Sequence, residues 1–369
     1  MKVSVPDYYK KFKCIAGECE DTCCAGWEVD VDEDSCLRYK QVKGQLGERL
    51  NEVMIPKAEG EGCSFRLTPD KRCPFLNEKN LCDIYAELGE DALCETCTYF
   101  PRFVHDYGSV REMGPAPSCF TAAQLMVNKG EETGLVIFED KSIPLRPNDI
   151  CPEAYLLLRD FRSEIFRMLW DKSLHLHIRL INIMDRAYDT QTELCEILET
   201  DIGAEVSDEY VPSDILRSWL KPFEGMEIIN NDWTGLISEL DTFYARSAGD
   251  REKCLHSFGD CCTFAEGAFE QLLFYYFFRY VLEAVHDGRL LCAVKTGIVA
   301  YLCVRELCAA RFAERGGLSR DEMADIFHLY SRQIEHSDVN FEHYRDVYDK
   351  DEDFSNYVIK GLLKSDLYR

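Results

Sequence analysis

Apolar residues at helical spacing dominate the chain from Pro152 onward. Gly, Pro, Asn and Asp residues break this pattern into segments, and Pro152 itself stands at a first-turn position. The spacing is typical of amphipathic helices, as in Ala154, Leu157, Leu158, Phe161, Ile165 and Leu169. It predicts helices over residues 153–170, 174–200, 213–221, 233–247, 264–286, 289–314, 319–335 and 351–366.

The preceding residues have a different pattern. They are dense in Cys, Gly, Pro and Asp, and only short periodic pieces lie between turn signals such as 16–17 and 68–70. Two β-prone stretches, around 29–31 and 135–138, predict a small hairpin at most. We therefore expect a mainly α protein, with an irregular, metal-stapled cysteine-rich domain over 1–125 and an α-helical domain over 126–369.

Charge and hydropathy narrow the choice of partners. The 369 residues carry a formal net charge of −25, which repels nucleic acid and anionic lipid at long range. The most apolar stretches, 269–285 and 290–304, are interrupted by charged residues, so no membrane span is expected. The N-terminal residues lack the apolar run of a signal peptide, which favours a cytoplasmic location.

Cysteine is unusually frequent for a cytoplasmic chain. Disulfides do not persist in a reducing compartment, yet the chain has 19 cysteines, and eleven of them lie in the first 119 residues. Clustering of this kind indicates metal ligation in one region rather than scattered apolar packing. Cys36, Cys63 and Cys119 are less regularly spaced than the others and rank behind them as ligands.

The first group of candidate ligands has the spacing Cys-x4-Cys-x3-Cys-Cys. Gly17 and Gly26 give its loops the backbone freedom to wrap tightly. Adjacent residues seldom point at the same metal, so one of the last two cysteines is expected to be a spectator, and Cys24 is favoured as the ligand. The four cysteines of this group are Cys14, Cys19, Cys23 and Cys24.

The second group has the spacing Cys-x8-Cys-x11-Cys-x2-Cys, and its last pair forms a common chelating turn. Residues 77–80 are expected to fold the second cysteine back toward the first. The group comprises Cys73, Cys82, Cys94 and Cys97. We expect sulfurs from both groups to converge on one metal centre; the spacing fits either zinc or an iron–sulfur cluster.

The residues around these cysteines resemble known families. CPFL, LCDIYAELG and Cys97 four residues before Pro101 resemble a cysteine-cluster family described as zinc- or iron-chelating. Together with PDYYKKFKC, CEDTCCAGWEVDVD and a long helical second half, they are similar to the flagellin lysine-N-methylase family. The recognisable residues cover about the first 125 positions.

The resemblance implies a bacterial cytoplasmic enzyme that transfers a methyl group from S-adenosylmethionine to lysine side chains of flagellin. It also implies an iron–sulfur cluster, of the 4Fe-4S type. A lysine amine attacks only when neutral, so a proton acceptor or an apolar pocket is required. Acceptor candidates near the sulfurs are Tyr8, Tyr9, Asp83, Glu95 and Tyr99.

The sequence leaves the catalytic and cofactor-binding residues unassigned. No Gly-x-Gly loop follows a predicted strand, so the Rossmann type of methyltransferase is not supported. Acidic residues beside the sulfurs disfavour bare thiolates, and Lys13, Arg72 and Arg102 are expected to help a metal offset that charge. Two other classes stay open: a non-catalytic, metal-stabilised protein-binding module, and a redox or iron-handling protein.

Overall fold

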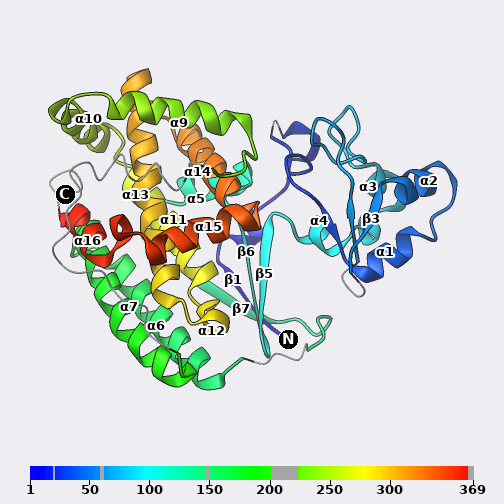
Figure 1. Cartoon of the computed structure of the whole chain (residues 1–369), viewed down its shortest axis with the longest axis horizontal. Helices are drawn as coiled ribbons and strands as arrows, with labels where there is room; N and C mark the ends of the chain where they lie inside the picture. Colours follow the sequence, from blue (N-terminus) through cyan, green and yellow to red (C-terminus); the bar gives the residue numbers. More distant parts are fainter. Residues whose placement is uncertain (20, 59–61, 146–149, 201–222, 224, 365–369) are drawn as a thin grey trace. The chain divides into compact units, whose positions relative to one another are not determined.

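The computed structural model describes residues 1–19, 21–58, 62–145, 150–200, 223 and 225–364 (Figure 1). The chain forms two compact units. The cysteine-rich unit is Lys10–Val104, and the helical unit combines Met1–Tyr9 with His105–Arg369. This division differs from the expected boundary at residue 125, because the N-terminal strand pairs with strands more than 100 residues away. The predicted helix over 213–221 lies outside the described residues.

A four-stranded mixed sheet belongs to the helical unit except for the first three residues of β5, 102–104, which are part of the cysteine-rich unit. Its strand order is β5-β6-β1-β7, with β1 parallel to β6 and antiparallel to β7. The expectation that 135–138 forms a hairpin at most is wrong, because its partner strand is distant in sequence. The strands are β1 (Lys2–Pro6), β5 (Arg102–Tyr107), β6 (Val110–Pro115) and β7 (Leu135–Glu139).

Helices make up most of this unit and confirm the mainly α class. The predicted helices at 153–170, 174–200, 233–247, 289–314 and 319–335 are found with small shifts at their ends. The structure also contains α10 and α15, whose sparse apolar residues gave no clear period. The helices are α5 (Phe120–Lys129), α6 (Pro152–Trp170), α7 (Leu176–Leu198), α9 (Asn231–Tyr244), α10 (Ala248–Cys261), α11 (Ala265–Tyr280), α12 (Ala284–Asp287), α13 (Leu290–Arg315), α14 (Arg320–Glu335), α15 (Asp338–Lys350) and α16 (Asn356–Lys364).

Helices α11 and α13 form the core of the helical unit. Both are buried on nearly every side, as expected for helices without a polar face (Figure 1). They approach closely at Gly297, where an added Cβ would lie 2.9 Å from a ring carbon of Phe277 and 3.0 Å from Cβ of Tyr276. The glycine therefore allows the two helices to pack at this point.

The cysteine-rich unit has its own small sheet and core. Strands β2 (Asp30–Val31), β4 (Cys63–Phe65) and β3 (Met54–Pro56) pair antiparallel in that order, so the prediction of at most a hairpin at 29–31 is also wrong. Short helices surround the sheet: α1 (Glu33–Tyr39), α2 (Gly44–Val53), α3 (Asp83–Leu88) and α4 (Glu95–Tyr99). The core includes Leu50, Phe65 and Phe75 and four buried cysteines.

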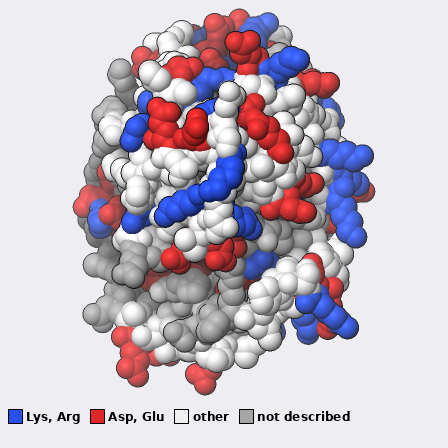
Figure 2. All heavy atoms as spheres, turned by 90° about the vertical axis from the view of Figure 1, so that its right-hand side faces the viewer, with Lys and Arg blue, Asp and Glu red and all other residues white. Residues whose placement is uncertain are grey.

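Among the described residues, no helix is long and apolar enough to cross a bilayer. On the face shown in Figure 2, basic and acidic side chains lie interspersed rather than in separate fields.

Candidate functional site

A short backbone pairing joins the two groups of cysteines. The amide of Cys73 donates to the carbonyl of Cys24, and the amide of Gly26 donates to the carbonyl of Lys71, both at 2.8 Å. Ala25 and Arg72 form the antiparallel bridge between these bonds. Gly26 has a φ of 89°, a conformation that favours glycine. Stretches separated by about fifty residues along the chain are thus held side by side.

A tight turn brings Cys82 back toward Cys73. Leu76 and Cys82 form an isolated antiparallel β-bridge, and the amide of Asn77 donates to the carbonyl of Leu81 at 2.9 Å. The Asn77 side chain also accepts from the amide of Leu81 at 3.1 Å, which closes the turn from inside. This arrangement confirms the predicted folding of the 77–80 loop.

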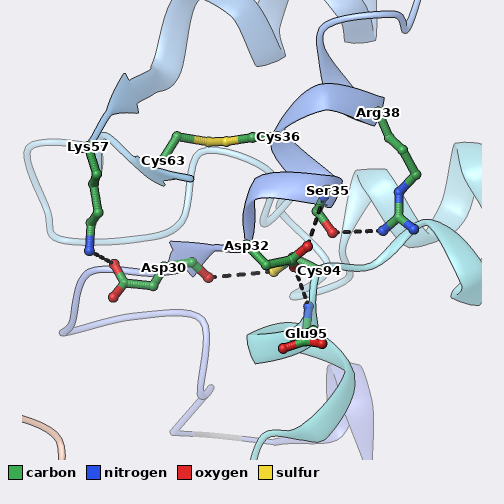
Figure 3. The surroundings of a disulfide bond; sticks show 9 residues. All are labelled: Asp30, Asp32, Ser35, Cys36, Arg38, Lys57, Cys63, Cys94 and Glu95. Atoms are coloured by element: carbon green, nitrogen blue, oxygen red, sulfur yellow. Dashed lines mark hydrogen bonds and ion pairs between the residues drawn. A yellow bond between two sulfur atoms is a disulfide. The ribbon is translucent and has the colours of Figure 1, made fainter. Parts of the chain in front are cut away.

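Cys94 and Cys97 are positioned by the start of α1. The Asp32 carboxylate caps α1 by accepting from the amide of Ser35 at 2.8 Å, and it accepts from the amide of Glu95 at 2.9 Å. Figure 3 shows this carboxylate between α1 and the Cys94–Glu95 turn. The Cys94 sulfur lies 3.7 Å from the carbonyl oxygen of Asp30 on β2. Sequence reasoning missed Asp32, because a capping aspartate ahead of a short helix carries no metal signal.

Five thiols lie close enough to affect one another's ionisation. Burial raises the pKa of Cys73 to about 12, and the neighbouring Cys24, Cys82 and Cys94 sulfurs add to the effect. Burial also raises the pKa of Cys82, with Cys24 contributing. The hydrogen bond between Cys97 and Cys94 raises the pKa of Cys97 and lowers that of Cys94. These five residues, Cys24, Cys73, Cys82, Cys94 and Cys97, are named the thiol cluster.

The remaining three predicted ligands make local contacts. Cys14 is exposed, and its sulfur accepts from the amide of Ala16 at 3.3 Å. Cys19 donates to the carbonyl of Asp21 at 3.3 Å, and the carbonyl of Cys23 accepts from the Trp27 indole at 2.8 Å. Within the described residues, no three or more His, Cys, Asp or Glu side chains are arranged to hold a metal ion. The ligand assignment therefore stays a prediction.

The loop of the first group packs against the turn of the second. An added Cβ at Gly17 would lie 2.8 Å from the carbonyl oxygen of Lys79 and 3.3 Å from the side chain of Leu81. Gly17 is therefore required because its lack of a side chain lets the two loops approach closely, and not because its backbone is left-handed. This contact places residues 16–18 beside the turn that carries Cys82.

Charges beside the sulfurs are balanced by a residue that sequence reasoning missed. Arg49 on α2 pairs with the Asp83 carboxylate at 2.8 Å and donates to the carbonyl of Pro74 at 2.9 Å. Of the predicted basic residues, Arg72 donates to the Asn80 side chain at 2.7 Å. Part of the positive charge that offsets the acidic residues beside the sulfurs therefore comes from Arg49, on a helix outside both cysteine motifs.

The proton-acceptor candidates are divided between the two units, and the charge of Asp83 contributes, after burial, to the raised pKa of the neighbouring Cys82. Tyr8 belongs to the helical unit and is buried, and burial raises its pKa well above the ordinary range. Asp83 is engaged by Arg49. Tyr39, which the sequence did not single out, lies near Cys94 and Cys97; burial and these sulfurs raise its pKa. Its hydroxyl donates to the carbonyl of Ala92 at 2.8 Å.

A disulfide joins Cys36 on α1 to Cys63 on β4 (Figure 3). The sequence-based expectation of no disulfides is therefore wrong for this pair. Both residues are buried in the core that also contains Cys73 and Cys94. The disulfide fixes α1 to the sheet, and α1 in turn holds the Cys94–Glu95 turn through Asp32.

The family signature lies in the other unit. Residues 164–358, more than half of the chain, match the family model for the FliB lysine N-methylase C-terminal domain. The chain belongs to the FliB lysine N-methylase family. This finding confirms the resemblance seen in the sequence, and it rests on residues outside the cysteine motifs.

Similarity to individual curated proteins supports the same family assignment. Over 109 residues the chain is 30% identical to the flagellar biosynthetic protein FliU of Salmonella muenchen and 29% identical to lysine-N-methylases of Salmonella typhimurium and Salmonella choleraesuis. The aligned residues are 28% of this chain; they cover 64% of FliU and 27% of each lysine-N-methylase. The chain thus spans less than two thirds of these curated relatives. No solved structure matches.

Charged side chains join the helices of the helical unit to the mixed sheet. Arg162 on α6 forms a bidentate pair with Glu112 on β6, with distances of 2.5 and 2.6 Å, and both side chains are buried. Near the end of α11, Glu283 accepts from Tyr107 at 2.5 Å and pairs with His105 at 2.8 Å. Burial raises the pKa of Glu283, but these contacts outweigh it and lower the value to about 2.

Proposed function

We propose that this protein is a lysine N-methyltransferase that acts on flagellin, with S-adenosylmethionine as methyl donor and a cysteine-ligated iron–sulfur cluster. The match of residues 164–358 to the lysine N-methylase C-terminal domain carries the proposal. The flagellar relative FliU supports a flagellar substrate. Flagellin is the substrate that the cysteine motifs also imply through their family resemblance.

The thiol cluster supports the inorganic part of the proposal. Its five sulfurs would be the donor atoms; they come from both cysteine groups, whose backbones are joined by the Cys24–Cys73 hydrogen bond. Sulfur donors suit iron–sulfur clusters and zinc and are unsuited to magnesium or calcium. When bound, an iron–sulfur cluster supplies a positively polarised, sulfur-ligated iron site. Cys24, Cys73, Cys82, Cys94 and Cys97 are the residues that would hold it.

The surrounding residues prepare the site for thiolates. Deprotonated sulfurs repel nearby carboxylates, and Arg49 lowers this repulsion by neutralising Asp83 at 2.8 Å. Asp32 fixes the turn that carries Cys94 by binding the Glu95 amide. The net charge of −25 attracts lysine-bearing substrates at long range.

The test begins with protein that has never been exposed to air. We expect near-equal iron and acid-labile sulfide, and the addition of methyl groups to flagellin lysines on incubation with S-adenosylmethionine, measured by intact mass. Cys97→Ser is expected to lose most of the iron and the methylation. The matched control is Cys261→Ser, an exposed cysteine of the helical unit, which is expected to keep both. Unmodified flagellin under these conditions, with iron and sulfide present, contradicts the methyltransferase assignment.

A second candidate is a metal-stabilised module without chemistry. The observation that favours it is burial: Cys94 is fully buried and Cys73 is 7% exposed, so both belong to the core of the cysteine-rich unit. Structural metal sites are closed in this manner, whereas catalytic ones keep an open position. If Cys97→Ser loses its metal yet methylates flagellin at the wild-type rate, the metal is structural and the methyltransferase assignment stands.

A further inference from the structure

Strand β7 forms one edge of the mixed sheet in the helical unit. It pairs with β1 on one side only, as the strand order β5-β6-β1-β7 shows (Figure 1). Its apolar side chains are exposed on both faces of the strand: Val136 by 43%, Ile137 by 67% and Phe138 by 37%. A long apolar edge is a template for another strand, and folded proteins normally blunt it with charge, proline or a covering segment.

The register shows which backbone groups of β7 face the open edge. Met1 and Asp140 exchange both backbone hydrogen bonds, and the amide of Asp7 donates to the carbonyl of Gly134. Hydrogen-bonded pairs alternate along an antiparallel ladder, so the even-numbered residues of β7 face β1. The amides and carbonyls of Leu135, Ile137 and Glu139 therefore point away from the sheet. In the part of the chain that the structure describes, these three residues have no other backbone partner.

Exposed carboxylates surround this edge. Glu131 and Glu132 precede the strand and Glu139 ends it, and all three are exposed. Glu139 lies opposite Lys2 in the register, but the two form no ion pair among the described residues. Lys129 is paired with Asp7 at 3.0 Å and with Glu131 at 3.7 Å. The edge thus combines apolar side chains with two exposed carboxylates, those of Glu132 and Glu139, that form no ion pair among the described residues.

We propose that β7 binds an extended, lysine-bearing segment of a protein partner as an added strand of the sheet. Main-chain bonds to residues 135, 137 and 139 supply the pairing, and alternate side chains of the segment supply the selectivity. On one face, apolar residues of the segment pack on Leu135 and Ile137 while a lysine lies opposite Glu139, as cross-strand pairs do. The inference rests on the proposed function for the identity of the partner, which is flagellin.

Charge decides between this occupant and a second copy of the chain. Two copies paired through β7 would match Val136 with Phe138 across the new interface. Each copy, however, carries a net charge of −25 and brings the same acidic flanks to the interface, so the two copies repel each other. A segment rich in lysine meets the same apolar strand and is attracted by those flanks.

The direct test measures hydrogen exchange at single amides of β7. Two probes are added separately to the full-length protein: purified flagellin, and a synthetic peptide that alternates Lys with Val or Ile. We expect hydrogen exchange at the amides of Leu135, Ile137 and Glu139 to become at least 10-fold slower. Exchange at the amides of Val136 and Phe138, which are already bonded to β1, should change little. If neither probe slows hydrogen exchange at the odd-numbered amides of β7, the proposal is overturned.

Substitution at Ile137 separates the main-chain bond from the side chain. Ile137→Pro removes an outward amide while leaving the pairing with β1 in place, because proline is tolerated on the free side of an edge strand. It is expected to weaken binding of either probe at least 10-fold. Ile137→Thr keeps the amide and is the matched control, with a smaller loss. Glu139→Lys is expected to weaken binding by about 3- to 10-fold. Wild-type affinity of Ile137→Pro, with its fold intact by circular dichroism, contradicts the proposal.

The two proposals fail in different ways. Wild-type protein that shows the alternating protection with flagellin but adds no methyl groups contradicts the methyltransferase assignment and supports docking at β7. A folded Ile137→Pro variant that methylates flagellin at the wild-type rate and KM overturns docking and leaves the assignment intact. The binding measurements are made without S-adenosylmethionine, so they do not depend on the activity.

Discussion

Buried cysteines occur in both units, but their neighbours differ. In the helical unit, Cys292, Cys303 and Cys308 are buried at separate positions along α13, and burial is the largest cause of their raised pKa values. They pack as small apolar residues. Cys308 has Cys262 as a neighbouring thiol, whereas Cys73 in the cysteine-rich unit has three, namely Cys24, Cys82 and Cys94. The number of thiols gathered around a buried cysteine, rather than burial itself, therefore separates candidate ligands from packing residues.

The units also differ in how their cores are built. The helical unit buries long helices and tightly bonded charge pairs, whereas the cysteine-rich unit has a core of twelve residues, four of which are cysteines. Small cores often need covalent or metal crosslinks. We therefore expect the stability of the cysteine-rich unit to depend on metal and that of the helical unit to depend on packing.

The largest effect is expected from breaking a buried charge pair in the helical unit. Glu112→Ala leaves the Arg162 guanidinium buried without its carboxylate, which should lower the free energy of unfolding by about 3–5 kcal/mol. Denaturant titration of the metal-loaded protein measures the loss. The double variant Glu112→Leu/Arg162→Met removes both charges and is expected to recover most of the stability. If the double variant loses as much unfolding free energy as Glu112→Ala alone, this account is contradicted.

Metal removal is expected to act on the other unit. A ligand present at 100 times its dissociation constant stabilises a fold by about 2.7 kcal/mol, and this contribution disappears when the metal is removed anaerobically. Hydrogen exchange should therefore accelerate in residues 10–104, particularly around the Cys24–Cys73 pairing, and stay unchanged in α11 and α13. Equal acceleration in both units would remove the proposed contrast.

A smaller effect is expected from acid acting on the helical unit. The pKa of Glu283 is lowered to about 2 in the folded state, so its carboxylate stabilises the fold above pH 4.5 and loses this effect as the pH falls toward 2. Glu283→Gln should be less stable than wild type by about 1.5 kcal/mol at pH 6, as expected for hydrogen bonds to a charged group. The difference between the two proteins should shrink steadily between pH 4.5 and pH 2. A constant difference would contradict the assigned contacts of His105 and Tyr107.

The smallest effect tests the cysteine comparison itself. Cys308→Ala removes a buried sulfur from α13 and should cost about 1 kcal/mol, in the range of small core deletions. The iron and sulfide content should not change. The paired variant Cys73→Ala is expected to lower both contents. Loss of iron in Cys308→Ala would show that burial in the helical unit also marks a ligand.

Much of the helical unit is predictable from its sequence. The repeated spacing of apolar residues predicted α6, α7, α13 and α14, because each of these helices buries apolar residues along its whole length. The mixed sheet was missed because β1 is parallel to β6 and pairs with β7 across more than 120 residues, a separation that no local pattern records. Helix α10 was missed because only Leu255 and Phe258 are buried along it.

The site was predictable in part, for a related reason. Cysteine is a rare and chemically distinctive residue, so the second group and its turn could be located before the structure was known. Arg49 and Asp32 act through single contacts with Asp83 and Glu95, and charged residues of this kind are common on any surface. The pairing of Cys36 with Cys63 depends on how α1 meets β4, which spacing does not specify.

The path of the chain through the two units has a consequence for biosynthesis. Strand β1 precedes the cysteine-rich unit, but its partners β6 and β7 follow it. During translation, the last residue of β7 is added 42 residues after Cys97, or roughly 2–8 s later at about 5–20 residues per second. The ribosome thus delivers all the cysteines of the insertion before the surrounding sheet can close. If the proposed cluster is assembled during translation, this is the interval in which the nascent chain offers all of these cysteines outside the closed sheet.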